Sequence, residues 1–143
     1  MIDNAAFLEH ANVFGKRYGT SKAEVANKRE RGQDVILEID WQGAQQVRLA
    51  MPQAIGIFIL PPSVEALAER LTSRGEDTQQ SIAKRLSEAK LDISQAQHFD
   101  YWVVNEDFDT AVQDFVAIVR TMRLQKDVQL QHQAVQTLVH FDG

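Results

Sequence analysis

Three short apolar runs, separated by segments with helical periodicity, constrain the fold of this chain more than any other feature. The runs cover residues 35–39, 54–60 and 101–104, and glycine, proline or asparagine bounds them. None alternates between apolar and polar residues as a half-exposed strand does, so each is predicted to be a strand buried on both faces. Strands that alternate with helices predict an α/β layer fold with a parallel sheet.

The predicted helices have recognisable first residues. Ser21, followed three residues later by Glu24, is a capping box, and Gly32 ends the helix that it begins. Gly15 and Gly19 are predicted to bracket a turn before this helix. Further helices are expected over residues 41–49, after Ser63, after Asp77 or Thr78, and over residues 108–122.

Composition excludes several classes of protein. The 143 residues are 44% hydrophobic, which is enough for a packed core. The net charge of −5 argues against a general nucleic-acid binder, and the absence of cysteine excludes disulfides and thiolate metal sites. No apolar run approaches the roughly 18 residues of a membrane span, and the first residues do not form a signal peptide. We therefore expect a cytoplasmic protein.

Two carboxylates, Glu38 and Asp40, stand at the end of the first predicted strand. Being two residues apart on a strand, they point to the same side. Ligands of open α/β sheets bind beyond the carboxyl ends of the strands, where this pair can orient a metal-bound phosphate or a ribose hydroxyl. The alternative is that both carboxylates are solvated or cap the next helix.

Three arginines, Arg70, Arg74 and Arg85, surround a glycine-containing break between two predicted helices. Guanidinium forks match phosphate oxygens, so this set suits a lid that closes on phosphates. The alternative is a solvated surface with three neighbouring acids, Glu69, Glu76 and Glu88.

Asn105 follows the third predicted strand and is placed to read a base edge. The alternative is that Asn105 or Asp107 caps the next helix. Glu9, with the hydroxyls of Tyr18 and Thr20 nearby, can read a purine. A carboxylate accepts from both N1–H and the exocyclic amine of guanine, but adenine N1 is itself an acceptor. The alternative for Glu9, Tyr18 and Thr20 is that they are an exposed acid and ordinary turn residues.

A phosphate-binding loop of the form G-x-x-x-x-G-K-[ST] is absent. The one Gly-Lys pair is Gly15-Lys16, with His10 at the position of the first glycine and Arg17 after the lysine. The histidines are scattered and form no H-x-x-x-H pair, so a histidine metal site is not indicated.

At this point the chain resembles the guanylate kinases of bacteria, which transfer a phosphoryl group from ATP to GMP in purine nucleotide metabolism. Six motifs in order carry the resemblance. They are FLEHA at 7–11, YGTS at 18–21, IDWQGA at 39–44, FILPPS at 58–63, RG at 74–75 with IAKR at 82–85, and VNEDFD at 104–109.

The resemblance implies a role for each candidate residue. Glu9 and Thr20 are similar to the guanine readers, Tyr18 to a ligand of the GMP phosphate, and Asp40 to the acid that faces the nucleotide and magnesium. Arg70, Arg74 and Arg85 are similar to the catalytic lid arginines that grip ATP phosphates, and Asn105 to a residue of the adenine-side loop. Glu38 stands where the family usually has Asp, and Arg17 where it often has Tyr.

The resemblance covers the C-terminal two-thirds of a guanylate kinase. It implies a partial nucleoside-monophosphate-kinase fold, a three-layer arrangement like that of P-loop NTPases but lacking its first strand and phosphate loop. Residues 1–33 would be a remnant of the GMP-binding subdomain, 34–73 core strands and helices, 74–90 the lid, and 91–143 the last core strand and C-terminal helix. Mg²⁺ would arrive with ATP and not be held by a dedicated protein cage.

Three functions follow from this resemblance. The first is a guanylate kinase, of which this chain alone is expected to be inactive or nearly so. The second is a guanylate kinase-like module that binds protein partners without catalysis, and the third is an inactive α/β fragment. The retained nucleotide residues favour the kinase lineage. GMP and ATP are then the expected ligands, with no nucleic-acid polymer and no membrane.

We also predict self-association or strand swapping. In the family fold the missing strand lies between the strands that resemble residues 35–39 and 55–60, so its loss leaves unpaired backbone that recruits another chain. Light scattering combined with amide exchange tests this prediction. A monodisperse monomer with protected Ile36 and Phe58 amides would contradict it.

Overall fold

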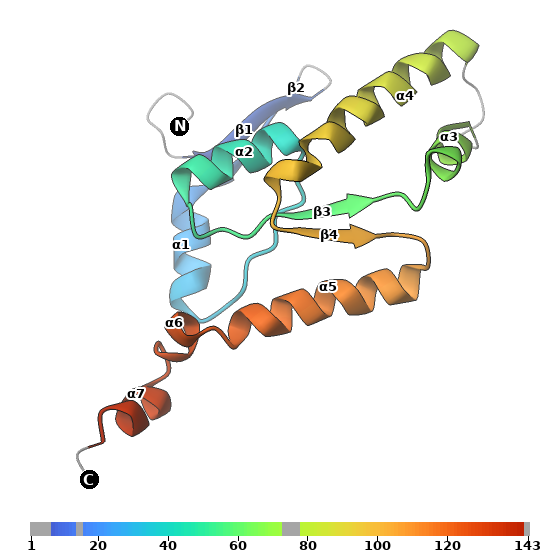
Figure 1. Cartoon of the computed structure of the whole chain (residues 1–143). Helices are drawn as coiled ribbons and strands as arrows, with labels where there is room; N and C mark the ends of the chain where they lie inside the picture. Colours follow the sequence, from blue (N-terminus) through green and yellow to red (C-terminus); the bar gives the residue numbers. More distant parts are fainter. Residues whose placement is uncertain (1–6, 14–15, 73–77, 142–143) are drawn as a thin grey trace. The chain divides into compact units, whose positions relative to one another are not determined.

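The computed structural model describes residues 7–13, 16–72 and 78–141 (Figure 1). Two compact units are present. Unit 1 comprises Met1–Ile57 and Glu88–Tyr101, and unit 2 comprises Phe58–Ser87 and Trp102–Gly143. The elements in chain order are β1 (Phe7–Val13), β2 (Lys16–Ser21), α1 (Lys22–Glu30), α2 (Trp41–Ala50), β3 (Ile57–Leu60), α3 (Val64–Thr72), α4 (Gln79–Ser94), the 3₁₀ turn η2 (Gln95–His98), β4 (Tyr101–Val104), α5 (Phe108–Arg123), α6 (Lys126–Gln129) and α7 (Gln133–Val139).

Unit 1 begins with an antiparallel hairpin of β1 and β2, which the sequence did not predict. Val13 pairs with Lys16 and Glu9 with Thr20, and the register is irregular between Phe7 and Glu9. The predicted turn bracketed by Gly15 and Gly19 is wrong, because residues 16–21 are a strand. Strand formation depends on the partner across the ladder more than on local propensity, and the lone segment carried no such information.

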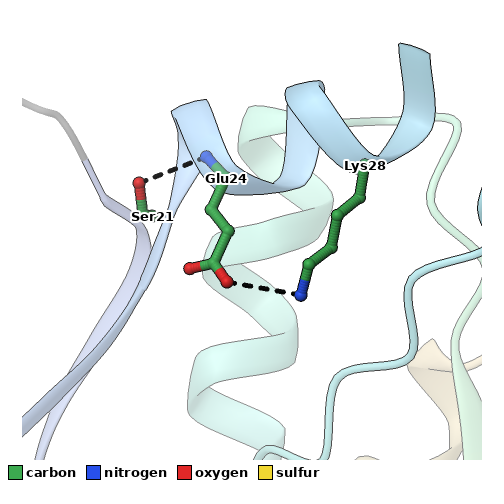
Figure 2. A network of polar contacts seen from close by, with 3 residues as sticks. All are labelled: Ser21, Glu24 and Lys28. Atoms are coloured by element: carbon green, nitrogen blue, oxygen red, sulfur yellow. Dashed lines mark hydrogen bonds and ion pairs between the residues drawn. The ribbon is translucent and has the colours of Figure 1, made fainter. Parts of the chain in front are cut away.

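Helix α1 starts and ends as predicted. The Ser21 Oγ accepts from the Glu24 backbone N–H at 3.4 Å, and Gly32 has a φ of 76° just after the helix. In place of the reciprocal contact of a capping box, the Glu24 carboxylate pairs with the Lys28 ammonium at 3.3 Å, one turn further along (Figure 2). The cap is therefore one-sided, and the acid instead joins an i,i+4 ion pair.

The core of unit 1 forms between α1 and α2, around Val25 and Val47, which are each 7% exposed. Helix α2 also lies against β1, and α1 against β2. The partly buried side chains packed on this core are Val35, Leu37, Ile39, Met51 and Ala54.

The strand predicted over residues 35–39 is wrong. This segment is part of no sheet, although its burial alternates: its odd-numbered residues are packed on the core and Ile36, Glu38 and Asp40 are exposed. Within the described ranges, the ladders are β1–β2 and β3–β4, so no neighbour is hydrogen-bonded to the segment as a strand requires. Burial on both faces is also wrong, since Ile36 is 61% exposed.

The predicted parallel sheet is present as the pair β3–β4. The Tyr101 N–H donates to the Gly56 carbonyl at 3.1 Å and the Asn105 N–H to the Leu60 carbonyl at 2.8 Å, so pairing advances in the same direction on both strands. β4 has the predicted bounds, whereas β3 is shorter than the predicted 54–60.

Strand β4 is buried at one position. Val103 is 1% exposed, whereas Trp102 is 58% and Val104 47% exposed on the other face, and Tyr101, on the face of Val103, is 40% exposed. The prediction of burial on both faces is therefore wrong for β4 as well, although the strand is apolar throughout.

The helices of unit 2 begin at the predicted polar residues. The Ser63 Oγ accepts from the Ala66 N–H at 3.0 Å, and the Thr78 Oγ1 accepts from the Ser81 N–H at 3.2 Å. Asp107, one of two candidates, caps α5 by accepting from the Thr110 N–H at 3.2 Å. Helices α6 and α7 were not predicted. In the part of the chain that the structure describes, no helix has the length and apolar character of a membrane span.

We predict that Ser21→Ala lowers the free energy of unfolding by about 0.5–1 kcal/mol, since it removes the acceptor for the Glu24 N–H. Lys28→Ala is the matched control, because an exposed i,i+4 pair contributes only about 0.3 kcal/mol. Urea denaturation measures both. Equal losses in the two variants would contradict the capping role.

Candidate functional site

Asp40 is the N-cap of α2. Its Oδ1 accepts from the Gly43 N–H at 2.8 Å, and its backbone carbonyl accepts from the Ala44 N–H at 2.9 Å. The carboxylate thus lies at the positive end of the helix dipole, which stabilises its charge. Of the two interpretations of Asp40, the structure shows the cap. A role toward a nucleotide stays a prediction, and the two are compatible because one carboxylate oxygen makes the capping bond.

Glu38 lies two residues before Asp40, and both are exposed. Burial alternates along residues 35–40, with the odd-numbered residues packed on the core. These two acids, one of them held by a helix cap, form the acidic part of the candidate site in unit 1, and their shared orientation toward a ligand stays a prediction.

Arg70 and Asn105 are in direct contact in unit 2. Arg70 lies in the last turn of α3, and its Nη2 donates to the Asn105 backbone carbonyl at 3.0 Å. The Asn105 N–H donates to the Leu60 carbonyl at the end of β3. The backbone of Asn105 is thus held by a strand on one side and by a helix on the other, at the carboxyl edge of two parallel strands. Ligands of α/β sheets bind at this edge.

The remaining arginines are placed unequally. Arg85 lies in the part of α4 that belongs to unit 2, and it is half-buried next to Leu86. Arg74 lies outside the described residues. The structure therefore assigns Arg70 and Arg85 to the same unit as Asn105, and it leaves the predicted lid arginine Arg74 unplaced.

The three predicted purine readers all lie in the β1–β2 hairpin. Glu9 and Thr20 are register partners, and Tyr18 is opposite Ala11. Sequence reasoning grouped these residues by chemistry without predicting the hairpin. In the hairpin, the backbone pairing sets Glu9 opposite Thr20, although the two residues are eleven positions apart in the sequence.

A second polar cluster, which sequence reasoning missed, fixes the start of β3 and β4 within unit 1. The Gly56 N–H donates to the Asp100 Oδ2 at 2.8 Å. Arg48 donates to the His98 carbonyl, and its guanidinium carbon is 6.0 Å from the centre of the Phe99 ring. A Cβ at position 56 would be 2.9 Å from the Phe99 ring, so a larger residue there would force the ring or the backbone to shift. These partners are 44 to 50 residues apart, and no local pattern indicates them.

Metal-binding capacity is limited in the residues that the structure describes. They contain no group of three or more His, Cys, Asp or Glu side chains that could hold an ion. Any divalent cation at Asp40 would therefore need most of its ligands from another source, such as the oxygens of a bound phosphate.

A parallel strand pair with helices after its strands, and an arginine at its carboxyl edge, make this an α/β protein with a ligand site expected at that edge. Comparison with known proteins makes the assignment narrower. A profile described as guanylate kinase matches residues 1–122, and this chain belongs to the guanylate kinase family.

The relatives and solved structures agree with this assignment. Guanylate kinase of Vibrio cholerae is 52% identical over 129 residues, which cover 90% of this chain and 62% of the relative. That of Thiobacillus denitrificans is 49% identical over 134 residues, covering 94% and 64%. The crystal structure of guanylate kinase from Anaplasma phagocytophilum matches with a TM-score of 0.71 and 32% identity, covering 87% and 60%. The chain thus spans a little under two-thirds of the length of the curated relatives it matches.

The capping role of Asp40 can be tested by substitution. We predict that Asp40→Asn leaves the free energy of unfolding within a few tenths of a kcal/mol, because an amide oxygen caps as well as a carboxylate does. Asp40→Ala should lower the free energy of unfolding by about 1 kcal/mol, because alanine has no oxygen to accept from the Gly43 N–H. Thermal and urea unfolding measure both. A large loss in the Asn variant would show that the negative charge, and not the cap, is what the fold uses.

Proposed function

We propose that this chain carries the nucleotide-binding groups of a guanylate kinase, which transfers a phosphoryl group from ATP to GMP and gives ADP and GDP. Membership of the family supports the class of reaction. The observation that carries the proposal for this chain is the contact between Arg70 and the Asn105 carbonyl at the carboxyl edge of β3 and β4. It joins a candidate phosphate-binding residue to a candidate base-reading loop.

The hairpin β1–β2 and helix α1 are proposed as part of the GMP-binding subdomain. In this role the Glu9 carboxylate accepts from guanine N1–H and from the exocyclic amine. Thr20 adds a hydroxyl contact to the base, and the Tyr18 hydroxyl donates to the GMP phosphate. The register pairing of Glu9 with Thr20 supports a shared ligand. AMP is rejected because its N1 cannot donate to a carboxylate.

The arginines are proposed to act on ATP. Phosphoryl transfer needs mainly positioning and the stabilisation of charge on the transferring group, which guanidinium forks supply. Arg74 and Arg85 grip phosphate oxygens, with residues 74–90 as the lid. Arg70 has a carbonyl partner in the structure, so we propose that it holds the adenine-side loop of Asn105 in place as well as contacting ATP.

Mg²⁺ is proposed to enter as the ATP complex. The described residues provide no three-ligand cluster, and one oxygen of Asp40 is used by the helix cap. Magnesium keeps several waters and is commonly bound through one or two carboxylates and substrate phosphates, which fits Asp40 as a single ligand or water-mediated contact. We place the activity in purine nucleotide metabolism in the cytoplasm.

Self-association through strand edges is proposed in addition. Residues 33–40 make no ladder in the described part of the chain, and Ile36 is 61% exposed. Such backbone can pair with a second copy, as expected of an exposed strand edge.

The function is tested by ADP formation with Mg-ATP and GMP, with AMP as the control acceptor. We expect little or no turnover from the 143-residue chain. We expect GMP-dependent turnover when the N-terminal third of the Vibrio cholerae relative is fused before Met1. In that fusion, Glu9→Gln should raise KM for GMP by about tenfold or more, because one of the two guanine donors then faces an NH₂ group in place of a carboxylate oxygen. Glu24→Gln, on an exposed helix, is the matched control.

Two results would contradict the proposal. If the fused chain binds ATP but uses GMP and AMP equally, the hairpin does not read guanine. If the fused chain folds but shows no turnover, the protein-binding alternative takes precedence.

A further inference from the structure

Two positive charges in strand β2, those of Lys16 and Arg17, have no part in the function proposed above. They are the only lysine and arginine in β1 and β2. They do not belong to a phosphate-binding loop, because the glycine pattern of such a loop is absent around them. Adjacent residues of a strand lie on opposite faces, so the two cations occupy different faces of the hairpin.

The register places Lys16 on the face of the candidate guanine readers. Directly opposed residues of an antiparallel pair share a face, and so do alternate residues along each strand. The pairing is continuous from Glu9 to the end of β1, and the pairs on this face, in order, are Glu9–Thr20, Ala11–Tyr18 and Val13–Lys16. Arg17 is opposite Asn12 and therefore lies on the other face.

The order of these pairs places Lys16 at the phosphate end of a bound nucleotide. Neighbouring pairs on one face are about 7 Å apart, at a rise of about 3.4 Å per residue. Tyr18, the proposed ligand of the GMP phosphate, is one such step from the pair that would read guanine, and Lys16 is one step further in the same direction. A nucleotide with its base at Glu9 and its phosphate at Tyr18 thus extends towards the position of Lys16.

We propose that Lys16 is a further ligand of the GMP phosphate. The inference rests on the proposed function, because Glu9 and Tyr18 define which end of the face takes the base and which takes the phosphate. A phosphate monoester carries about two negative charges at pH 7, and a lysine ammonium binds it as a point charge with three donors on a flexible stem.

Charge complementarity along the face supports this role. The other polar residues of the three pairs are Glu9, an acid, and Tyr18 and Thr20, which supply neutral hydroxyls. An acid at one end and a cation at the other match a ligand that presents N–H donors at its base and an anion at its phosphate. Lys16 then contributes to the affinity for the nucleotide and not to that for the nucleoside.

The test is an NMR titration of the 143-residue chain with GMP, AMP and guanosine. Lys16→Gln and Arg17→Gln each remove one positive charge from β2, but from opposite faces. We expect Lys16→Gln to raise the dissociation constant for GMP about fivefold and to leave that for guanosine unchanged. Lys16→Arg keeps the charge and should bind GMP nearly as well as the unchanged chain does.

Arg17→Gln is the matched control and should change the dissociation constant for GMP by less than about twofold. Its charge is on the far face, and at about 0.15 M salt the field of an exposed charge is screened over about 8 Å. Guanosine has the base without the phosphate, so its binding shows that each variant keeps its fold. Equal weakening of GMP binding by both variants would show a general attraction and overturn the inference. Equal weakening of GMP and guanosine binding by Lys16→Gln would also overturn it.

The two proposals fail in different ways. If GMP is preferred over AMP but Lys16→Gln binds GMP as the unchanged chain does, the proposed function stands and the Lys16 inference is wrong. If GMP and AMP bind equally and Lys16→Gln weakens both, guanine reading is wrong and the phosphate contact of Lys16 stands. Failure of the unchanged chain to bind either nucleotide would overturn both.

Discussion

The parallel pairing of β3 and β4 is the interaction on which the candidate ATP side depends. It places Leu60 and Asn105 at one edge, where the Asn105 N–H donates to the Leu60 carbonyl and Arg70 donates to the Asn105 carbonyl. If this pairing were lost, α3 and the start of α5 would no longer be fixed at a common edge. An isolated two-stranded sheet is only marginally stable in water, so the helices that pack on it supply the remaining stabilisation. Val103 in β4 is 1% exposed and is the most buried side chain of this strand pair.

Much of this architecture could be predicted from local chemistry. Helix starts at Ser21, Ser63 and Asp107 were predicted because a hydroxyl or carboxylate satisfies backbone donors within three residues of itself. The apolar run of β4 and the parallel class of the sheet followed from patterning. The candidate site residues followed from side-chain chemistry together with the resemblance to guanylate kinases, which the family comparison confirms. Their individual roles stay predictions.

The rest depends on contacts between distant residues. The β1–β2 hairpin forms through cross-strand pairs such as Glu9 with Thr20, and the segment alone has no strong strand pattern. The run at residues 35–39 has that pattern but forms no ladder, because pairing needs a neighbour as well as propensity. Arg48 and Asp100 reach partners 50 and 44 residues away, and no periodicity indicates such contacts. Sequence patterns thus predicted the helices of this chain better than its strand pairing.

Amide hydrogen exchange of the 143-residue chain can show whether the β1–β2 hairpin recognises guanine, as proposed above. GMP and AMP at about 1 mM differ in the base edge that they present to a carboxylate, and weak binding is detectable at that concentration. We expect GMP, but not AMP, to slow exchange of the backbone amides of β1 and β2. Equal protection by both nucleotides, or protection confined to unit 2, would contradict it.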